Sequence, residues 1–214
     1  MFSNQTANYK MEQKTAKKAI LIYTEQTPNP EAIKYVTNTM LYDGTADFKT
    51  LELAEEWSPL AEHLFKLPYV KYVYISQNFV SVTKEFNYSW DDVMLQLKEE
   101  IKKYIMDGGA IIKDGFEEYL REKEEAEGNS FQYTGKDKEI VEKIKQLIDK
   151  YVKPAVEMDG GNIEFNSFED GKVTVIMQGS CSGCPSSTVT LKSGIEGMLK
   201  RMVPEVKEVI SVAG

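Results

Sequence analysis

The sequence has little of several features that commonly carry function. Its 214 residues contain two cysteines and one histidine, and no apolar run approaches the roughly 20 residues that a membrane-spanning helix needs. Residues 1–18 are polar and include lysines without an apolar core, so we expect no secretory signal. They also lack arginine and contain Glu12, a poor match to a mitochondrial presequence. We therefore predict a cytoplasmic, bacterial protein with no membrane partner.

The sequence also lacks an excess of basic residues. The formal net charge is −8, whereas binding to nucleic acid phosphates favours a basic face. We therefore expect no nucleic acid partner. The apolar fraction of 42% and the charged fraction of 28% are ordinary for a globular protein.

The chain is long enough for one or two domains, each with its own core. The first half reads as mixed α/β, with strand-like and helix-like segments up to a Gly-Gly pair at 108–109. An acid-rich stretch follows, which favours a solvated linker that can be helical. We predict an α/β (α+β) fold of two small mixed domains, over 19–109 and 136–214, joined by an acidic linker over 110–135.

The C-terminal part has a clear order of elements. A helix capped by Asp137 and ended by Pro154 precedes a turn at 159–161 and two strands. A loop with both cysteines follows, and then a helix that begins near Pro185 and a last strand over 205–212. The order α-β-β-α-β predicts a three-stranded sheet with two helices.

The stretch GSCSGCPSST at 179–188 holds Cys181 and Cys184. Two cysteines three positions apart can bind one metal ion or one edge of a cluster. Their expected position, between a strand end and a helix start, stabilises thiolates through the helix dipole and unpaired N–H groups. The small residues around them allow the backbone to approach closely.

Two thiolates alone leave a metal site incomplete, because zinc sites and iron–sulfur clusters usually have four protein ligands. The sequence has no third cysteine, and His63 lies in the other predicted domain, where we expect it to be packed or solvent-facing. A second copy of the loop in a two-fold dimer supplies the missing ligands. A thiol–disulfide oxidoreductase and a zinc-stapled interaction module are alternatives that the spacing also allows.

The sequence also resembles a known family. The run from Ile140 through the cysteine loop to Glu196 resembles the NifU-type C-terminal domain of Nfu iron–sulfur proteins, and the segments 24–30, 58–61 and 80–84 are similar to the Nfu N-terminal domain. The resemblance implies a non-enzymatic carrier or scaffold for a labile [4Fe–4S] cluster, with [2Fe–2S] as the other type.

The same resemblance implies how the cluster is held and exchanged. It implies Cys181 and Cys184 as ligands, contributed by both chains of a homodimer. It also implies apo iron–sulfur client proteins and an upstream cluster scaffold as partners. The sequence contains no phosphate-binding glycine loop or nucleophile motif that would indicate catalysis.

Overall fold

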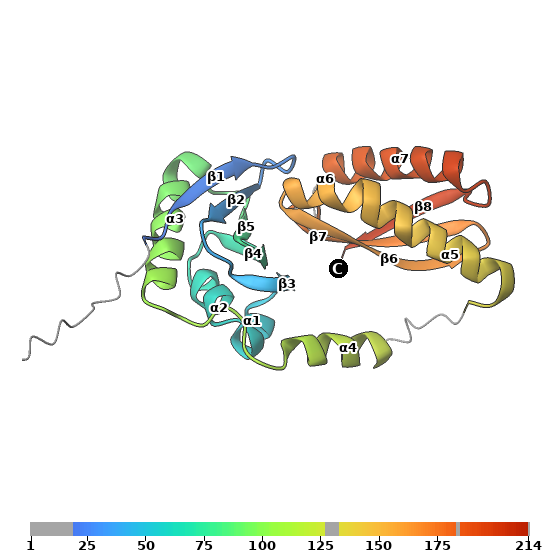
Figure 1. Cartoon of the computed structure of the whole chain (residues 1–214). Coiled ribbons are helices and arrows are strands. Elements are labelled where there is room, and N and C mark those ends of the chain that lie inside the picture. Colours follow the sequence, from blue (N-terminus) through green and yellow to red (C-terminus); the bar gives the residue numbers. More distant parts are fainter. Residues whose placement is uncertain (1–18, 127–132, 183–184, 214) are drawn as a thin grey trace, which may run out of the picture.

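The computed structural model describes residues 19–126, 133–182 and 185–213, and contains two sheets (Figure 1). We call residues 19–126 the N-terminal region and residues 133–213 the C-terminal region. The predicted mixed α and β fold is confirmed, since each region combines its own sheet with its own helices. Within the described ranges, no helix combines the length and apolarity that a bilayer crossing demands.

The N-terminal region is built on a five-stranded antiparallel sheet of order β1-β2-β5-β4-β3. Residues Val70–Gln77 and Phe79–Lys84 form a hairpin, and Gln77 takes the left-handed conformation at its turn, with φ 47°. The strand β3 was not predicted, because its sequence YDGTADF is poor in β-branched residues. The strands are β1 (Ile22–Gln26), β2 (Ala32–Thr37), β3 (Tyr42–Phe48), β4 (Val70–Gln77) and β5 (Phe79–Lys84).

Three helices pack on one face of this sheet: α1 (Leu51–Trp57), α2 (Pro59–Phe65) and α3 (Trp90–Met106). Ser58 caps α2, since its hydroxyl accepts a hydrogen bond from the Ala61 amide at 3.0 Å. Leu64, Leu97 and Val82 are fully buried in the shared core. The other face of the sheet carries a different set of side chains, including Lys34 and Ser81.

The segment predicted as an acidic linker contains the helix α4 (Phe116–Ala126). Phe116 is buried, and its ring lies 5.6 Å from Phe48 and 5.8 Å from Trp57. These contacts attach the start of α4 to the core of the N-terminal region. The acidic composition of the segment gave no indication that Phe116 packs into this core.

The C-terminal region begins with α5 (Gly135–Leu147), which passes through a π-helical turn, η1 (Ile148–Val152), into α6 (Lys153–Met158). The predicted end of the helix at Pro154 is wrong, because Pro154 lies in the first turn of α6, where its missing N–H is tolerated. The predicted cap is also wrong, because Thr134 rather than Asp137 precedes the helix. The π-helical turn changes the hydrogen-bond pattern before the proline, so the helical chain continues from α5 into α6.

The three-stranded sheet has the order β6-β7-β8, from β6 (Gly161–Glu169), β7 (Lys172–Gly179) and β8 (Glu208–Ala213). The pair β6–β7 is an antiparallel hairpin, whereas β7 and β8 are parallel and are joined through α7 (Pro185–Met202). One core unites Val175 of β7 with Ile144 of α5 and Leu199 of α7. This core fixes the end of β7, where the cysteine loop begins.

Candidate functional site

The cysteine loop leaves the sheet at Gly179, the last residue of β7, and α7 begins at Pro185. The expected position between a strand end and a helix start is therefore present. Gly179 has φ +65°, a conformation that favours glycine, and a Cβ there would lie 2.8 Å from the Gly160 carbonyl oxygen. Cys181 lies in the described part of the loop, and the predicted ligand Cys184 lies outside the described residues.

The turn at 159–161 supports the loop. The Ser180 amide donates to the Gly160 carbonyl oxygen at 3.2 Å, and the Ser180 hydroxyl donates to the Asp159 carbonyl oxygen at 2.5 Å. The Ser182 amide closes the loop by donating to the Gly179 carbonyl oxygen at 3.1 Å. The turn at 159–161 and the loop that begins at Gly179 are distant in sequence, and these hydrogen bonds stabilise both.

The Cys181 side chain is 5% exposed and packs with the core of the C-terminal region. Gly161 makes this position possible, since a Cβ there would lie 3.0 Å from the Cys181 sulfur. The Ser180 hydroxyl oxygen lies 3.9 Å from the same sulfur. The residues beside the thiol, Gly161 and Ser180, are small, so backbone groups can lie close to the sulfur.

Two elements of the N-terminal region also reach the loop. Asn29, in the turn between β1 and β2, donates from Nδ2 to the Ser180 carbonyl oxygen at 3.1 Å. The Lys49 ammonium, just after β3, donates to the Ser182 hydroxyl at 2.8 Å and pairs with Asp47 at 2.9 Å. Sequence reasoning missed these residues, although the two prolines that flank Asn29 are typical of a turn.

Charged groups beside the loop have shifted acidities. Burial raises the pKa of the Asp47 carboxyl, and the opposing attraction of Lys49 and the hydrogen bond from the Gly179 amide do not cancel that effect. Burial also raises the pKa of Asp159, against the attraction of Lys34. The surroundings of the loop therefore disfavour carboxylate charge.

His63 does not approach the cysteine loop. Its Nε2 lies 3.1 Å from the Glu100 carboxylate, and its ring contacts Tyr104 with centroids 5.3 Å apart. Among the described residues, no group of three or more histidines, cysteines, aspartates and glutamates is arranged to hold a metal ion. The part of the chain that the structure describes thus supplies no additional ligand set to complete the cysteine pair.

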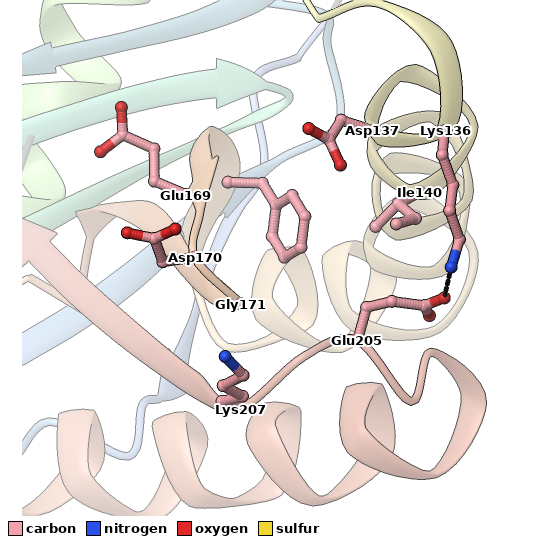
Figure 2. Close-up of a pocket in the computed structure, with 9 residues that line it drawn as sticks. Lys136, Asp137, Ile140, Glu169, Asp170, Gly171, Glu205 and Lys207 are labelled. Carbon is pink, nitrogen blue, oxygen red and sulfur yellow. Dashed lines mark ion pairs between the residues drawn. The ribbon is translucent and has the colours of Figure 1, made fainter.

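A pocket of about 760 Å³ opens at the other end of β7 (Figure 2). It is lined by both charge signs, and its Lys136 and Glu205 form an ion pair at 3.1 Å. Because β7 has eight residues at about 3.4 Å each, this pocket lies roughly 25 Å from the cysteine loop. It shares no residue with that loop.

Comparisons with known proteins place the chain in a family. NifU-like domains match residues 144–210, and the N-terminal domain of the scaffold protein Nfu/NifU matches residues 22–108. The mitochondrial NFU1 iron-sulfur cluster scaffold homolog of Homo sapiens is 38% identical over 195 residues, which are 90% of this chain and 72% of that protein. The chain therefore belongs to the Nfu family of NifU-related scaffold proteins, as the resemblance implied.

Two further relatives agree. The NFU1 homolog of Drosophila persimilis is 37% identical over 206 residues, 95% of this chain and 69% of that protein. The mitochondrial NifU-like protein 4 of Arabidopsis thaliana is 39% identical over 196 residues, 90% of this chain and 66% of that protein. The family is one of scaffold proteins rather than enzymes, which confirms the prediction of a non-enzymatic role.

The prediction of a bacterial cytoplasmic protein is wrong. The relatives named above are mitochondrial proteins of animals and a plant. The prediction depended on the composition of residues 1–18, which lie outside the described residues. The absence of arginine from so short a stretch is too weak a signal to assign a compartment.

Proposed function

We propose that this protein carries an iron–sulfur cluster, bound by Cys181 and Cys184 from each of two copies, and delivers it to apo-proteins. The observation that carries the proposal is a two-cysteine loop in a chain whose sequence holds no further cysteine and one remote histidine. A [4Fe–4S] cluster requires four ligands, and two copies of the loop supply them. The family relatives, named as iron–sulfur cluster scaffolds in mitochondria, support this function and that compartment.

The surroundings of Cys181 suit a thiolate ligand. Gly161 has no side chain, so its backbone can lie close to the sulfur. The loop leads into the start of α7, where the helix dipole favours negative charge. A cluster bound by two residues from each chain is also released more readily than one enclosed by a single chain. Release to apo-proteins, and loading from an upstream scaffold, need that property.

Anaerobic reconstitution of the full chain with iron and sulfide tests the proposal. We expect about four irons per dimer, a [4Fe–4S] Mössbauer spectrum, and elution as a dimer after loading. Cys181→Ala and Cys184→Ala should each lose nearly all of the iron, because one thiolate per chain leaves two ligands per dimer. Ser167→Ala, a matched control in β6, should keep it.

The alternatives give different results in the same preparation. A zinc-stapled module would bind stoichiometric colourless zinc and lose its fold on chelation. A thiol–disulfide oxidoreductase would reduce model disulfides with turnover in the absence of metal. A Cys181→Ala protein that retains the full cluster contradicts the proposed ligands.

A further inference from the structure

The second face of the five-stranded sheet carries a row of side chains in cross-strand register. Lys34 of β2 pairs with Ser81 of β5, Ser81 pairs with Tyr74 of β4, and Tyr74 pairs with Asp47 of β3. Residues directly opposite on neighbouring strands project to the same face. We call these four residues the transverse row. It lies opposite the face that packs against α1, α2 and α3.

The transverse row meets backbone groups that flank the cysteine loop. The Ser81 hydroxyl donates to the Gly160 carbonyl oxygen at 2.7 Å, and the Lys34 ammonium donates to the carbonyl oxygens of Glu157 at 3.2 Å and Met158 at 3.0 Å. The Asp47 carboxylate accepts from the Gly179 amide at 3.4 Å. Carbonyls at the end of α6 and in the glycine turn thus accept hydrogen bonds from the other region.

The contact is closely fitted as well as polar. A Cβ on Gly160 would lie 2.6 Å from the Ser81 hydroxyl oxygen, and a Cβ on Gly179 would lie 2.9 Å from the Tyr74 ring. Lys34, Ser81 and Tyr74 are 8%, 2% and 1% exposed. A lysine and a serine are rarely this buried on a sheet face unless a partner satisfies them.

The segment that carries the cysteine is held by the same surface. Asn29, 3% exposed, binds the carbonyl before Cys181, and Lys49 binds the hydroxyl after it. Ser180 and Ser182 are consequently buried. The motif Thr27-Pro28-Asn29-Pro30, which the thiol chemistry leaves unexplained, therefore has a position against the loop.

We propose that the transverse row, with Asn29 and Lys49, forms a cap that closes over the cysteine loop and competes with a second copy of the chain for it. The inference rests on the proposed function, because a cluster shared between two chains requires both loops to be open. The closed arrangement is the resting apo-protein. The cap must open before the dimer forms. The apparent affinity for the cluster is therefore the intrinsic affinity multiplied by the fraction of molecules that are open.

The accessibility of Cys181 in the full-length apo-protein tests the cap without any cluster. Cys184→Ser leaves one cysteine, and alkylation by iodoacetamide is followed by mass spectrometry. Asn29→Ala/Ser81→Ala removes two hydrogen bonds across the contact. A typical hydrogen bond contributes about 1 kcal/mol, so labelling should accelerate roughly five- to a hundredfold.

The matched control is Asn38→Ala/Ser76→Ala. Both residues also donate to backbone carbonyls, of Ala19 and Gly44, but within the N-terminal region. This control should label within about twofold of the parent protein. If the double variant loses its fold by tryptophan fluorescence, Ser81→Ala alone replaces it, with an expected acceleration of about two- to tenfold. Equal labelling of the capped and opened proteins overturns the proposal.

A second arm uses proteins with both cysteines, iron and sulfide. The opened variant should form the loaded dimer faster than the parent protein and reach the same final iron content. Slower or unchanged dimer formation counts against the cap. If no protein binds iron while the labelling difference persists, the cap stands and the proposed cluster function fails, so the two failures are distinguishable.

Discussion

The two sheets of the molecule use their faces differently. The three-stranded sheet supports a single core and presents a cysteine loop at the end of its central strand. The five-stranded sheet buries three helices on one face and directs polar side chains from the other toward that loop. The C-terminal region buries Cys181 in its own core, and the N-terminal region adds hydrogen bonds to Ser180 and Ser182 on either side of it. The cysteine and part of the surface around it therefore belong to different parts of the chain.

The largest expected effect separates the two cores. Leu97→Ala and Ile144→Ala each remove a fully buried side chain, from the N-terminal and the C-terminal core, and should cost about 3 kcal/mol of unfolding free energy. Both tryptophans, Trp57 and Trp90, lie in the N-terminal region. Leu97→Ala should lower the midpoint seen by tryptophan fluorescence, and Ile144→Ala mainly the midpoint seen by circular dichroism. Coincident shifts in both variants would show that the regions unfold as one unit.

Removal of a single charge at the contact comes next. Lys49→Ala leaves the Asp47 carboxylate, whose side chain is 6% exposed, without its ion-pair partner. Because the Lys49 side chain is itself 23% exposed, we expect a cost below the ~3–5 kcal/mol typical of fully buried pairs, about 2 kcal/mol, or roughly 30-fold faster labelling of Cys181. Asp47→Asn/Lys49→Met removes both charges and should recover most of the protection. Failure of that recovery would show that the lysine acts through Ser182 alone.

A smaller effect compares two glycines with similar backbones. Gly108 has φ +76° and open space where a Cβ would lie, whereas Gly160 has φ +82° and faces Ser81 across the contact. Gly108→Ala should cost about 1 kcal/mol in unfolding free energy, from backbone strain alone. Gly160→Ala should cost about 1 kcal/mol more, and Ser81→Ala should relieve part of that excess. Equal costs at the two glycines would place Ser81 away from Gly160 in solution.

The smallest effect is that of pH on the contact. Burial raises the pKa of Asp47 in the closed arrangement, so the closed form binds the proton more tightly than the open form. Closure should therefore strengthen as the pH falls through that pKa and weaken as it rises. Hydrogen exchange at the Gly179 amide, corrected for its intrinsic pH dependence, measures this effect. Asp47→Asn should abolish the dependence, and a dependence that survives the substitution would point to another group.

The sequence predicted the local setting of the cysteine loop, between a strand and a helix, better than the contacts around it. The spacing of Cys181 and Cys184 is local, so the strand–loop–helix setting could be inferred from neighbouring residues. Pro154 shows where local rules fail. A proline usually ends a helix, but here a π-helical turn precedes it and the helical chain continues into α6. Asn29 and Ser180 are 151 positions apart, and their hydrogen bond has no local signature in either segment.

The same contrast explains the acidic segment. Seven acids among residues 113–127 predicted solvation, and Glu117, Glu118, Glu122 and Glu125 of α4 are indeed exposed. Phe116 packs into the N-terminal core in spite of them, because a few aromatic contacts outweigh an averaged composition. The cellular compartment was the hardest property to predict, since the contacts within the folded protein do not depend on it.

The attachment of α4 to the N-terminal core also limits how far the two regions can separate. Residues 127–132 connect the end of α4 to the described start of the C-terminal region, and so short a chain spans at most about 25 Å. A tether of this length gives the cap an effective concentration in the millimolar range at its own loop. In the proposed mechanism, a second copy at micromolar concentration would not displace the cap by docking alone. The bonds to the shared cluster would supply the difference, so cargo rather than protein concentration would decide when two chains associate.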